Sequence, residues 1–280
     1  MRTIRIGHSP DADDAYMFYA ITHDIIDIEG PEPSEHEEVL EDIQSLNERA
    51  LFGELEMTAI SAAVYPKVAD QYRILACGAS MGLNYGPIVV SKESCSLQSL
   101  QGKRVAMPGE HTTAYLLSRI FLPSVESVQY PFDKVMDAVT DDEVDAAVVI
   151  HEGQLTYVDA GLTKLADLGE IWWDDTGLPL PLGLDCVRRD LGNDWHLALG
   201  KALQQSIDTA FRQNKKAVDY ALQFGRGIDP VRGEQFAKMY VNDLTYNMGE
   251  AGQRALVKLF ELAAAKGLID RTPSVDIVEL

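Results

Sequence analysis

The sequence has few of the features that identify a protein class at once, and cysteine is the first of them. Only three of the 280 residues are cysteines, Cys77, Cys95 and Cys186, an odd number without a C-x-x-C pair or the spacing of zinc ligands. We therefore expect reduced thiols rather than a disulfide framework or a zinc centre. No apolar run approaches the ~20 residues needed to span a bilayer, so no membrane partner is expected.

Basic residues are also scarce, because 24 lysines and arginines face 44 aspartates and glutamates, which gives a formal charge of -20. A surface of this sign repels nucleic-acid phosphates and anionic membranes, so nucleic acid is not an expected partner. The start, "MRTIRIGHSP", passes directly into a strand pattern, without a basic leader or the apolar core of a secretion signal. We therefore expect a cytoplasmic protein. Nothing in the sequence indicates its oligomeric state.

Signatures of nucleotide binding and nucleophilic catalysis are missing: there is no P-loop, no G-x-G-x-x-G motif and no Ser-His-Asp or Cys-His arrangement. Strand and helix patterns instead alternate along the chain, which favours an α/β fold. Hydroxyl or acidic side chains mark three strand-to-helix junctions. We predict a strand over 3–7 before a helix capped by Ser9, a strand ending near Ile60 before one capped by Ser61, and a strand ending at Met107 before one that begins near Thr112.

Two extended segments have the pattern of crossings between two lobes: "YGPIVVSKE" (85–93) and "GLPLPLGLDCVRRDLG" (177–192), both punctuated by glycine and proline. They bracket a separate set of strand and helix patterns, as expected when one lobe is inserted into another. We predict a discontinuous large lobe of residues 1–91 and 184–280 and a small lobe of residues 92–183. A cleft between such lobes closes over a ligand by hinge motion.

The stretch "VDAAVVIHEG" ends a short apolar run on a histidine. Residues 146–150 are small or β-branched without polar alternation, which is the pattern of a strand buried on both faces of a parallel sheet. His151 then lies at the carboxyl end of that strand, where open α/β sheets bind their ligands. A catalytic histidine and a hydrogen-bonded structural histidine both fit this position.

The three junctions fit a ligand site as well as plain helix capping. The aspartates of "HSPDADD" are explained as acidic side chains in a first helical turn, so we expect no metal ion there. Thr112 and Thr113 in "PGEHTTAY" lie beside free helix N–H groups, which suits a ligand carboxylate or simple capping by one threonine. Ser61 has the same two interpretations.

An ordered set of segments extends over nearly the whole chain: "HSPDADDAYMFYAI", "LEDIQSLNERAL", "MTAISAAVYPKV", "VAMPGEHTTAYLL", "VVIHEGQLTY" and "TGLPLPLG". In these segments the sequence resembles the 1,4-dihydroxy-6-naphthoate synthase family of the futalosine route to menaquinone. The resemblance implies an α/β, two-lobed type 2 periplasmic-binding-protein-like fold with two hinge crossings. It also implies a carbon–carbon lyase without metal or organic cofactor. Its substrate would be an aromatic carboxylate, cyclic dehypoxanthine futalosine, cleaved to 1,4-dihydroxy-6-naphthoate and dihydroxyacetone.

The same resemblance implies roles for individual residues. The general base falls on His151, and the expected substrate contacts are Ser9, Asp14, Ala59, Ile60, Ser61, Thr112, Thr113 and Ala114. Many relatives have S-P-x-x-N-D at the first helix, whereas Asp13 here replaces an amide donor with an acceptor. Two alternatives share the fold: a solute-binding protein of a transporter, which needs no base, and the related chorismate dehydratase, which lacks the "IHE" segment.

Overall fold

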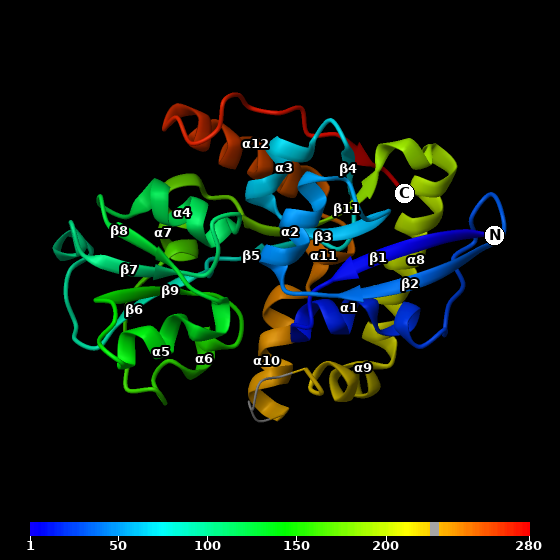
Figure 1. Cartoon of the computed structure of the whole chain (residues 1–280). Helices are drawn as coiled ribbons and strands as arrows, with labels where there is room; N and C mark the ends of the chain where they lie inside the picture. Colours follow the sequence, from blue (N-terminus) through cyan, green and yellow to red (C-terminus); the bar gives the residue numbers. More distant parts are fainter. Residues whose placement is uncertain (225–229) are drawn as a thin grey trace.

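The computed structural model describes residues 1–224 and 230–280, which form two β-sheets covered by helices (Figure 1). The larger sheet has the strand order β12-β4-β11-β3-β1-β2, and β5 pairs with β11 beside this path. Its central strand β3 is fully buried, as expected for a sheet covered on both faces. The strands are β1 (Arg2–His8), β2 (Ser34–Leu40), β3 (Met57–Ser61), β4 (Tyr72–Leu75), β5 (Ser80–Gly82), β11 (Leu180–Arg188) and β12 (Ile277–Val278).

The smaller sheet has the strand order β10-β6-β9-β7-β8. β7 pairs in parallel with β8 and β9, whereas β6 pairs antiparallel with both of its neighbours. β9 is buried along its whole length, as predicted, and ends one residue earlier than predicted. The strands are β6 (Ile88–Ser91), β7 (Arg104–Met107), β8 (Glu126–Gln129), β9 (Ala146–Val149) and β10 (Thr163–Asp167).

Helices cover both sheets (Figure 1). One core joins β1 to α1, α8, α9 and α10, and a second joins α3, α4, α7 and α12 to strands of both sheets. A third lies between α5 and the smaller sheet. The helices are α1 (Ala12–Thr22), α2 (Ile43–Leu51), α3 (Tyr65–Val68), α4 (Thr113–Phe121), α5 (Val135–Thr140), α6 (Gly153–Thr156), α7 (Leu168–Thr176), α8 (Asn193–Arg212), α9 (Asn214–Ala221), α10 (Pro230–Tyr240), α11 (Asp243–Tyr246) and α12 (Gly249–Ala265). None of the helices in the described ranges is long and apolar enough to cross a membrane.

The chain passes between the two sheets twice (Figure 1). It leaves the larger sheet after β5, enters the smaller one at β6, and returns between α7 and β11. The expected lobe boundaries after residues 91 and 183 need a correction. β6 already pairs in the smaller sheet, and Leu180 and Pro181 already pair with β5 in the larger one. Gly86, Pro87, Gly177 and Pro179 lie in the crossings, whereas Pro181 and Gly183 pair within β11, and the apolar runs beside the crossings are strands.

The helix starts later than predicted at one of the three junctions, and a second junction lacks the side-chain hydrogen bond of a cap. α1 begins at Ala12 rather than near Ser9, because the Ser9 hydroxyl accepts from the Asp11 amide at 3.2 Å and forms a local turn ahead of the helix. Ser61 caps nothing with its side chain, and a short 3-10 turn follows it before α3. Thr112 is the cap of α4, as predicted, since its Oγ1 accepts from a backbone amide in the first turn at 3.1 Å.

Candidate active site

A cavity lies between the two sheets, at the carboxyl ends of β1, β3 and β9. The space within it is about 750 Å³, counting the part open to solvent. Residues from both sheets therefore face one space. All of the residues predicted for the site line it: Ser9, Asp14, Ala59, Ile60, Ser61, Thr112, Thr113, Ala114 and His151.

His151 follows β9 in the left-handed backbone region, with φ +50°, a strained conformation for a residue with a side chain. Its ring is almost buried. Nδ1 lies 3.3 Å from Oε2 of Glu152, which is itself buried, and Nε2 lies 3.3 Å from the carbonyl oxygen of Phe132. Both nitrogens thus face acceptors across long contacts. The ring must release one of these contacts before it can take a proton from a ligand.

The hydroxyls at the start of α4 are already used inside the protein. Thr112 Oγ1 donates to the carbonyl of Gly109 at 2.8 Å, and Thr113 Oγ1 donates to the carbonyl of Leu182 at 2.7 Å. In the described part of the chain, the amides of Thr113 and Ala114 have no hydrogen-bond partner. These are the unpaired N–H groups of a first helical turn, which suit an anion. Backbone amides rather than threonine hydroxyls are therefore the donors at this end of the cavity.

Ser61 is held by a residue that the sequence did not single out. Asn47 of α2 is fully buried, donates from Nδ2 to Ser61 Oγ at 3.0 Å, and accepts from the Ser61 amide at 2.8 Å. Because the Ser61 oxygen acts as acceptor here, its hydroxyl proton stays available for a ligand. The only signal for Asn47 in the sequence is a polar side chain on the apolar face of a helix.

The loop after β1 is held by Asp14 and His8. Asp14 Oδ2 accepts from the Ser9 amide at 2.7 Å, while His8 places Nδ1 3.0 Å from the Ser9 carbonyl and Nε2 2.9 Å from Glu38. Both nitrogens of His8 thus face acceptors at hydrogen-bonding distance, so the ring is held between the loop and β2. Burial raises the pKa of Asp14, and the His8 charge opposes that shift. Sequence analysis did not identify this partnership of His8.

Three further carboxyls, those of Asp11, Asp13 and Asp185, line the cavity without having been predicted as contacts. Asp13 lies 3.4 Å from the Ser80 hydroxyl, and Asp185 of β11 is 1% exposed. Burial and neighbouring carboxyls raise the pKa of Asp13 and Asp185. Within the described residues, no group of three or more histidine, cysteine or acidic side chains is arranged to hold a metal ion. A charged residue inside the apolar run "LPLGLDCV" is the signal that could have identified Asp185.

Comparison with known proteins identifies the family. A family model described as "Menaquinone biosynthesis" matches residues 4–265. The 1,4-dihydroxy-6-naphthoate synthase of Thermus thermophilus is 39% identical, with 98% of each chain covered, and that of Streptomyces coelicolor is 37% identical, with 95% of each chain covered. The chain belongs to the 1,4-dihydroxy-6-naphthoate synthase family. It is therefore an enzyme of menaquinone biosynthesis, as the resemblance in the sequence implied.

Solved structures agree with the fold expected for a 1,4-dihydroxy-6-naphthoate synthase family member. Protein AF1704 from Archaeoglobus fulgidus is 49% identical, with a TM-score of 0.90 over 95% of this chain and 98% of that one. The alkanesulfonate-binding protein SsuA from Xanthomonas axonopodis is 15% identical, with a TM-score of 0.71 over 99% of this chain and 96% of that one. The second likeness concerns the fold alone. It confirms the periplasmic-binding-protein-like architecture.

Proposed function

We propose that this enzyme is a carbon–carbon lyase that converts cyclic dehypoxanthine futalosine to 1,4-dihydroxy-6-naphthoate and dihydroxyacetone, with His151 as general base. The observation that carries the proposal is the position of His151. It stands at the end of a buried strand, in a cavity that also receives the unpaired amides of Thr113 and Ala114. An anionic ligand and a titratable ring can therefore meet in one space.

The residues divide the chemistry between binding and proton transfer. The amides of Thr113 and Ala114 and the hydroxyl of Ser61 would hold the substrate carboxylate. His151 would take a proton while negative charge develops on a substrate oxygen, and the aromatic product would supply driving force. General-base catalysis of this kind contributes roughly 10²–10⁴-fold. Closure of the two lobes would exclude water from the cavity.

The contact between His151 and Glu152 supports the role of base. A carboxylate beside one ring nitrogen orients the ring and stabilises the imidazolium that proton transfer produces. Because Glu152 is 3% exposed, solvent screens this interaction little. When a ligand displaces the long contact of Nε2 with the Phe132 carbonyl, Nε2 becomes the nitrogen that can accept the proton.

Incubation of the purified protein with cyclic dehypoxanthine futalosine tests the proposal. We expect formation of 1,4-dihydroxy-6-naphthoate and dihydroxyacetone, followed by chromatography and mass spectrometry, in the presence of a chelator as well as without it. Parallel reactions with chorismate test the dehydratase alternative. Tight binding of cyclic dehypoxanthine futalosine without any turnover would instead favour the solute-binding alternative and contradict the lyase.

A further inference from the structure

The cavity lining has two parts of opposite hydrogen-bonding character. At the start of α4, backbone amides and the nearby Ser61 hydroxyl offer donors. Near the start of α1 and along β11, the cavity wall carries four carboxyl groups, and none of its described lining residues is a lysine or arginine. The first part suits an anion, whereas the second repels one. The carboxyls are those of Asp11, Asp13, Asp14 and Asp185.

Among the described residues, Asp185 has a buried oxygen with no hydrogen-bond partner. This oxygen is Oδ1, and the whole residue is 1% exposed. Gly78, which also lines the cavity, lies directly against the carboxyl, because a Cβ at Gly78 would be 2.2 Å from Oδ2 of Asp185. A buried carboxyl without a donor is costly for folding, so its presence indicates a partner supplied from the cavity.

Asp13 adds a second group of the same kind. It is partly exposed to the cavity, with the Ser80 hydroxyl at 3.4 Å as a weak donor. Burial and neighbouring carboxyls favour the neutral acid form of both Asp13 and Asp185. A neutral carboxyl has one O–H donor and one carbonyl acceptor. One donor and one acceptor in the same group are complementary to an alcohol hydroxyl, which can also both donate and accept a hydrogen bond.

We propose that Asp185 and Asp13 form a subsite for hydroxyl groups of the ligand, distinct from the α4 amides that receive its carboxylate. The inference rests on the proposed function and deepens it, because cyclic dehypoxanthine futalosine carries a sugar-derived polyol part that its naphthoate product lacks. The acidic part of the lining would therefore select the substrate over the product. It would also set the direction in which the substrate lies in the cavity.

Calorimetric titration of two Asp185 variants tests this subsite. Asp185→Leu should weaken the binding of cyclic dehypoxanthine futalosine about tenfold or more, and change the binding of 1,4-dihydroxy-6-naphthoate less than about twofold. Asp185→Asn keeps a donor and an acceptor and should restore most of the affinity. Ser61→Ala, beside the α4 amides, serves as the control and should weaken both compounds alike. An equal loss for both compounds in Asp185→Leu would overturn the inference.

Two further measurements keep the inference independent of the proposed function. Ligand-observed NMR should show that the wild type prefers gluconate to hexanoate, two carboxylates of one length, and that Asp185→Leu removes this preference. This outcome would support the subsite even if cyclic dehypoxanthine futalosine does not bind, which by itself would overturn the proposed function. Equal binding of the two acids by the wild type would overturn the subsite. Asp185→Asn should melt at or above the wild-type temperature, and a clear decrease would show a structural role instead.

Discussion

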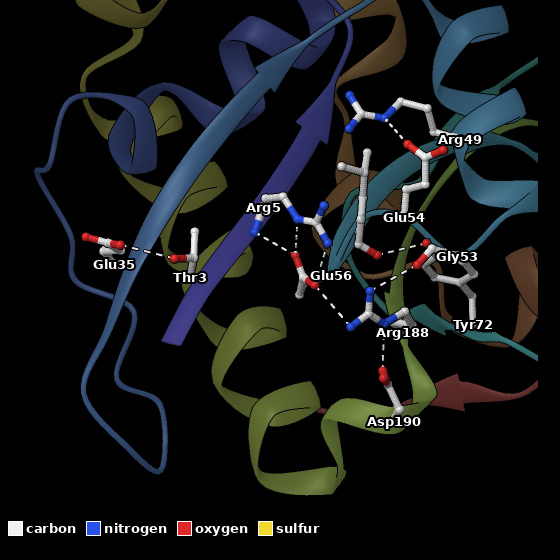
Figure 2. Close-up of polar contacts among 11 residues, drawn as sticks. Thr3, Arg5, Glu35, Arg49, Gly53, Glu54, Glu56, Tyr72, Arg188 and Asp190 are labelled. Carbon is white, nitrogen blue, oxygen red and sulfur yellow. Dashed lines mark hydrogen bonds and ion pairs between the residues drawn. The ribbon is translucent and has the colours of Figure 1, made fainter. Parts of the chain in front are cut away.

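Two buried carboxylates beside the carboxyl-terminal half of β11 have opposite surroundings. Glu56, just before β3, is 5% exposed and accepts from the backbone amide and the Nε of Arg5 at 3.0 and 2.9 Å. Its other oxygen lies 3.0 Å from Nη2 of Arg5 and 3.0 Å from Nη2 of Arg188 (Figure 2). Asp185, three residues before Arg188 in the sequence, faces the cavity, and one of its oxygens has no donor within residues 1–224 and 230–280.

The difference indicates that the Glu56 carboxylate stabilises the fold, whereas the Asp185 carboxyl is available to a ligand in the cavity. Burial raises the pKa of Glu56, but hydrogen bonds from Arg5 and the charge of Arg188 outweigh it, so the net pKa lies below its ordinary value. Burial and neighbouring acids leave the pKa of Asp185 well above its ordinary value. The charged form is thus stabilised at the Glu56 end of the sheet, and the neutral form at the cavity end.

The largest expected effect concerns His151, the base proposed at the cavity end. His151→Asn should lower turnover roughly 10²-fold or more while the melting temperature and substrate affinity stay near their wild-type values. Single-turnover kinetics, calorimetry and thermal melting on this variant check the prediction. His23→Asn, at the end of α1 and outside the cavity, is the control and should leave turnover unchanged.

A structural His151 would give the opposite result. Its replacement would leave a buried partner unpaired and cost about 1–3 kcal/mol of stability, and activity would decline only with the folded fraction. Near-normal turnover with a lowered melting temperature would therefore contradict the role of His151 as the base and show that the histidine stabilises the fold.

The second effect concerns Glu56. Glu56→Gln should lower the free energy of unfolding by about 1.5–3 kcal/mol, because hydrogen bonds from two arginines to a charged acceptor are lost or weakened. Turnover per folded molecule should not change, since Glu56 lies outside the cavity lining. Urea unfolding and active-site titration measure the two quantities separately. A loss of turnover without a loss of stability would show that the Glu56 end also serves catalysis.

The third prediction uses pH to contrast the two carboxylates. The folded-state pKa of Glu56 is lowered, so its stabilisation is present above the unfolded value of ~4.3 and is lost as pH falls through the folded pKa. The folded-state pKa of Asp185 is raised, so the folded protein binds more protons there. Its contribution falls as pH rises from the unfolded value of ~3.9 toward the folded pKa.

Melting curves from acidic to neutral pH should show these opposite signs. The deficit of Glu56→Gln relative to wild type should shrink as pH decreases, whereas the advantage of Asp185→Asn should grow as pH increases above ~4. A pH-independent difference for Asp185→Asn would mean that its carboxyl titrates alike in the folded and unfolded chain. The contrast between the two ends would then have no electrostatic basis.

Local sequence patterns predicted those features of the site that depend on residues close together in the chain. The apolar run before His151 indicates a buried strand, and its length places the ring at the strand end. Thr112 caps α4 through an amide three residues along, a contact that spacing alone can predict. The Ser9 cap was wrong because a serine two residues before an amide can also close a turn of its own.

Contacts between distant segments could not be predicted from the sequence in the same way. Asn47 and Ser61 belong to different elements, and only the packing of α2 against β3 brings them together. Asp185 is separated from Asp13 by most of the chain, so their shared cavity depends on the order of strands in the larger sheet. A polar side chain within an apolar pattern is a signal of such contacts, but it does not name the partner.

The smallest expected effect tests whether Arg188 stabilises the Glu56 carboxylate through its charge or through its directed hydrogen bonds. Arg188 binds Glu56 through Nη2, Asp190 through Nε at 2.7 Å and the carbonyl of Gly53 through Nη1 at 3.0 Å (Figure 2). Arg188→Lys keeps the charge but loses the planar fork, so the free energy of unfolding should fall by about 0.5–1.5 kcal/mol, less than for Glu56→Gln. Urea unfolding checks this loss, with Arg49→Lys as the control at a more exposed pair, where we expect less than about 0.5 kcal/mol. A loss equal to that of Glu56→Gln would show that directed hydrogen bonds, rather than charge, stabilise the buried carboxylate at this end of the sheet.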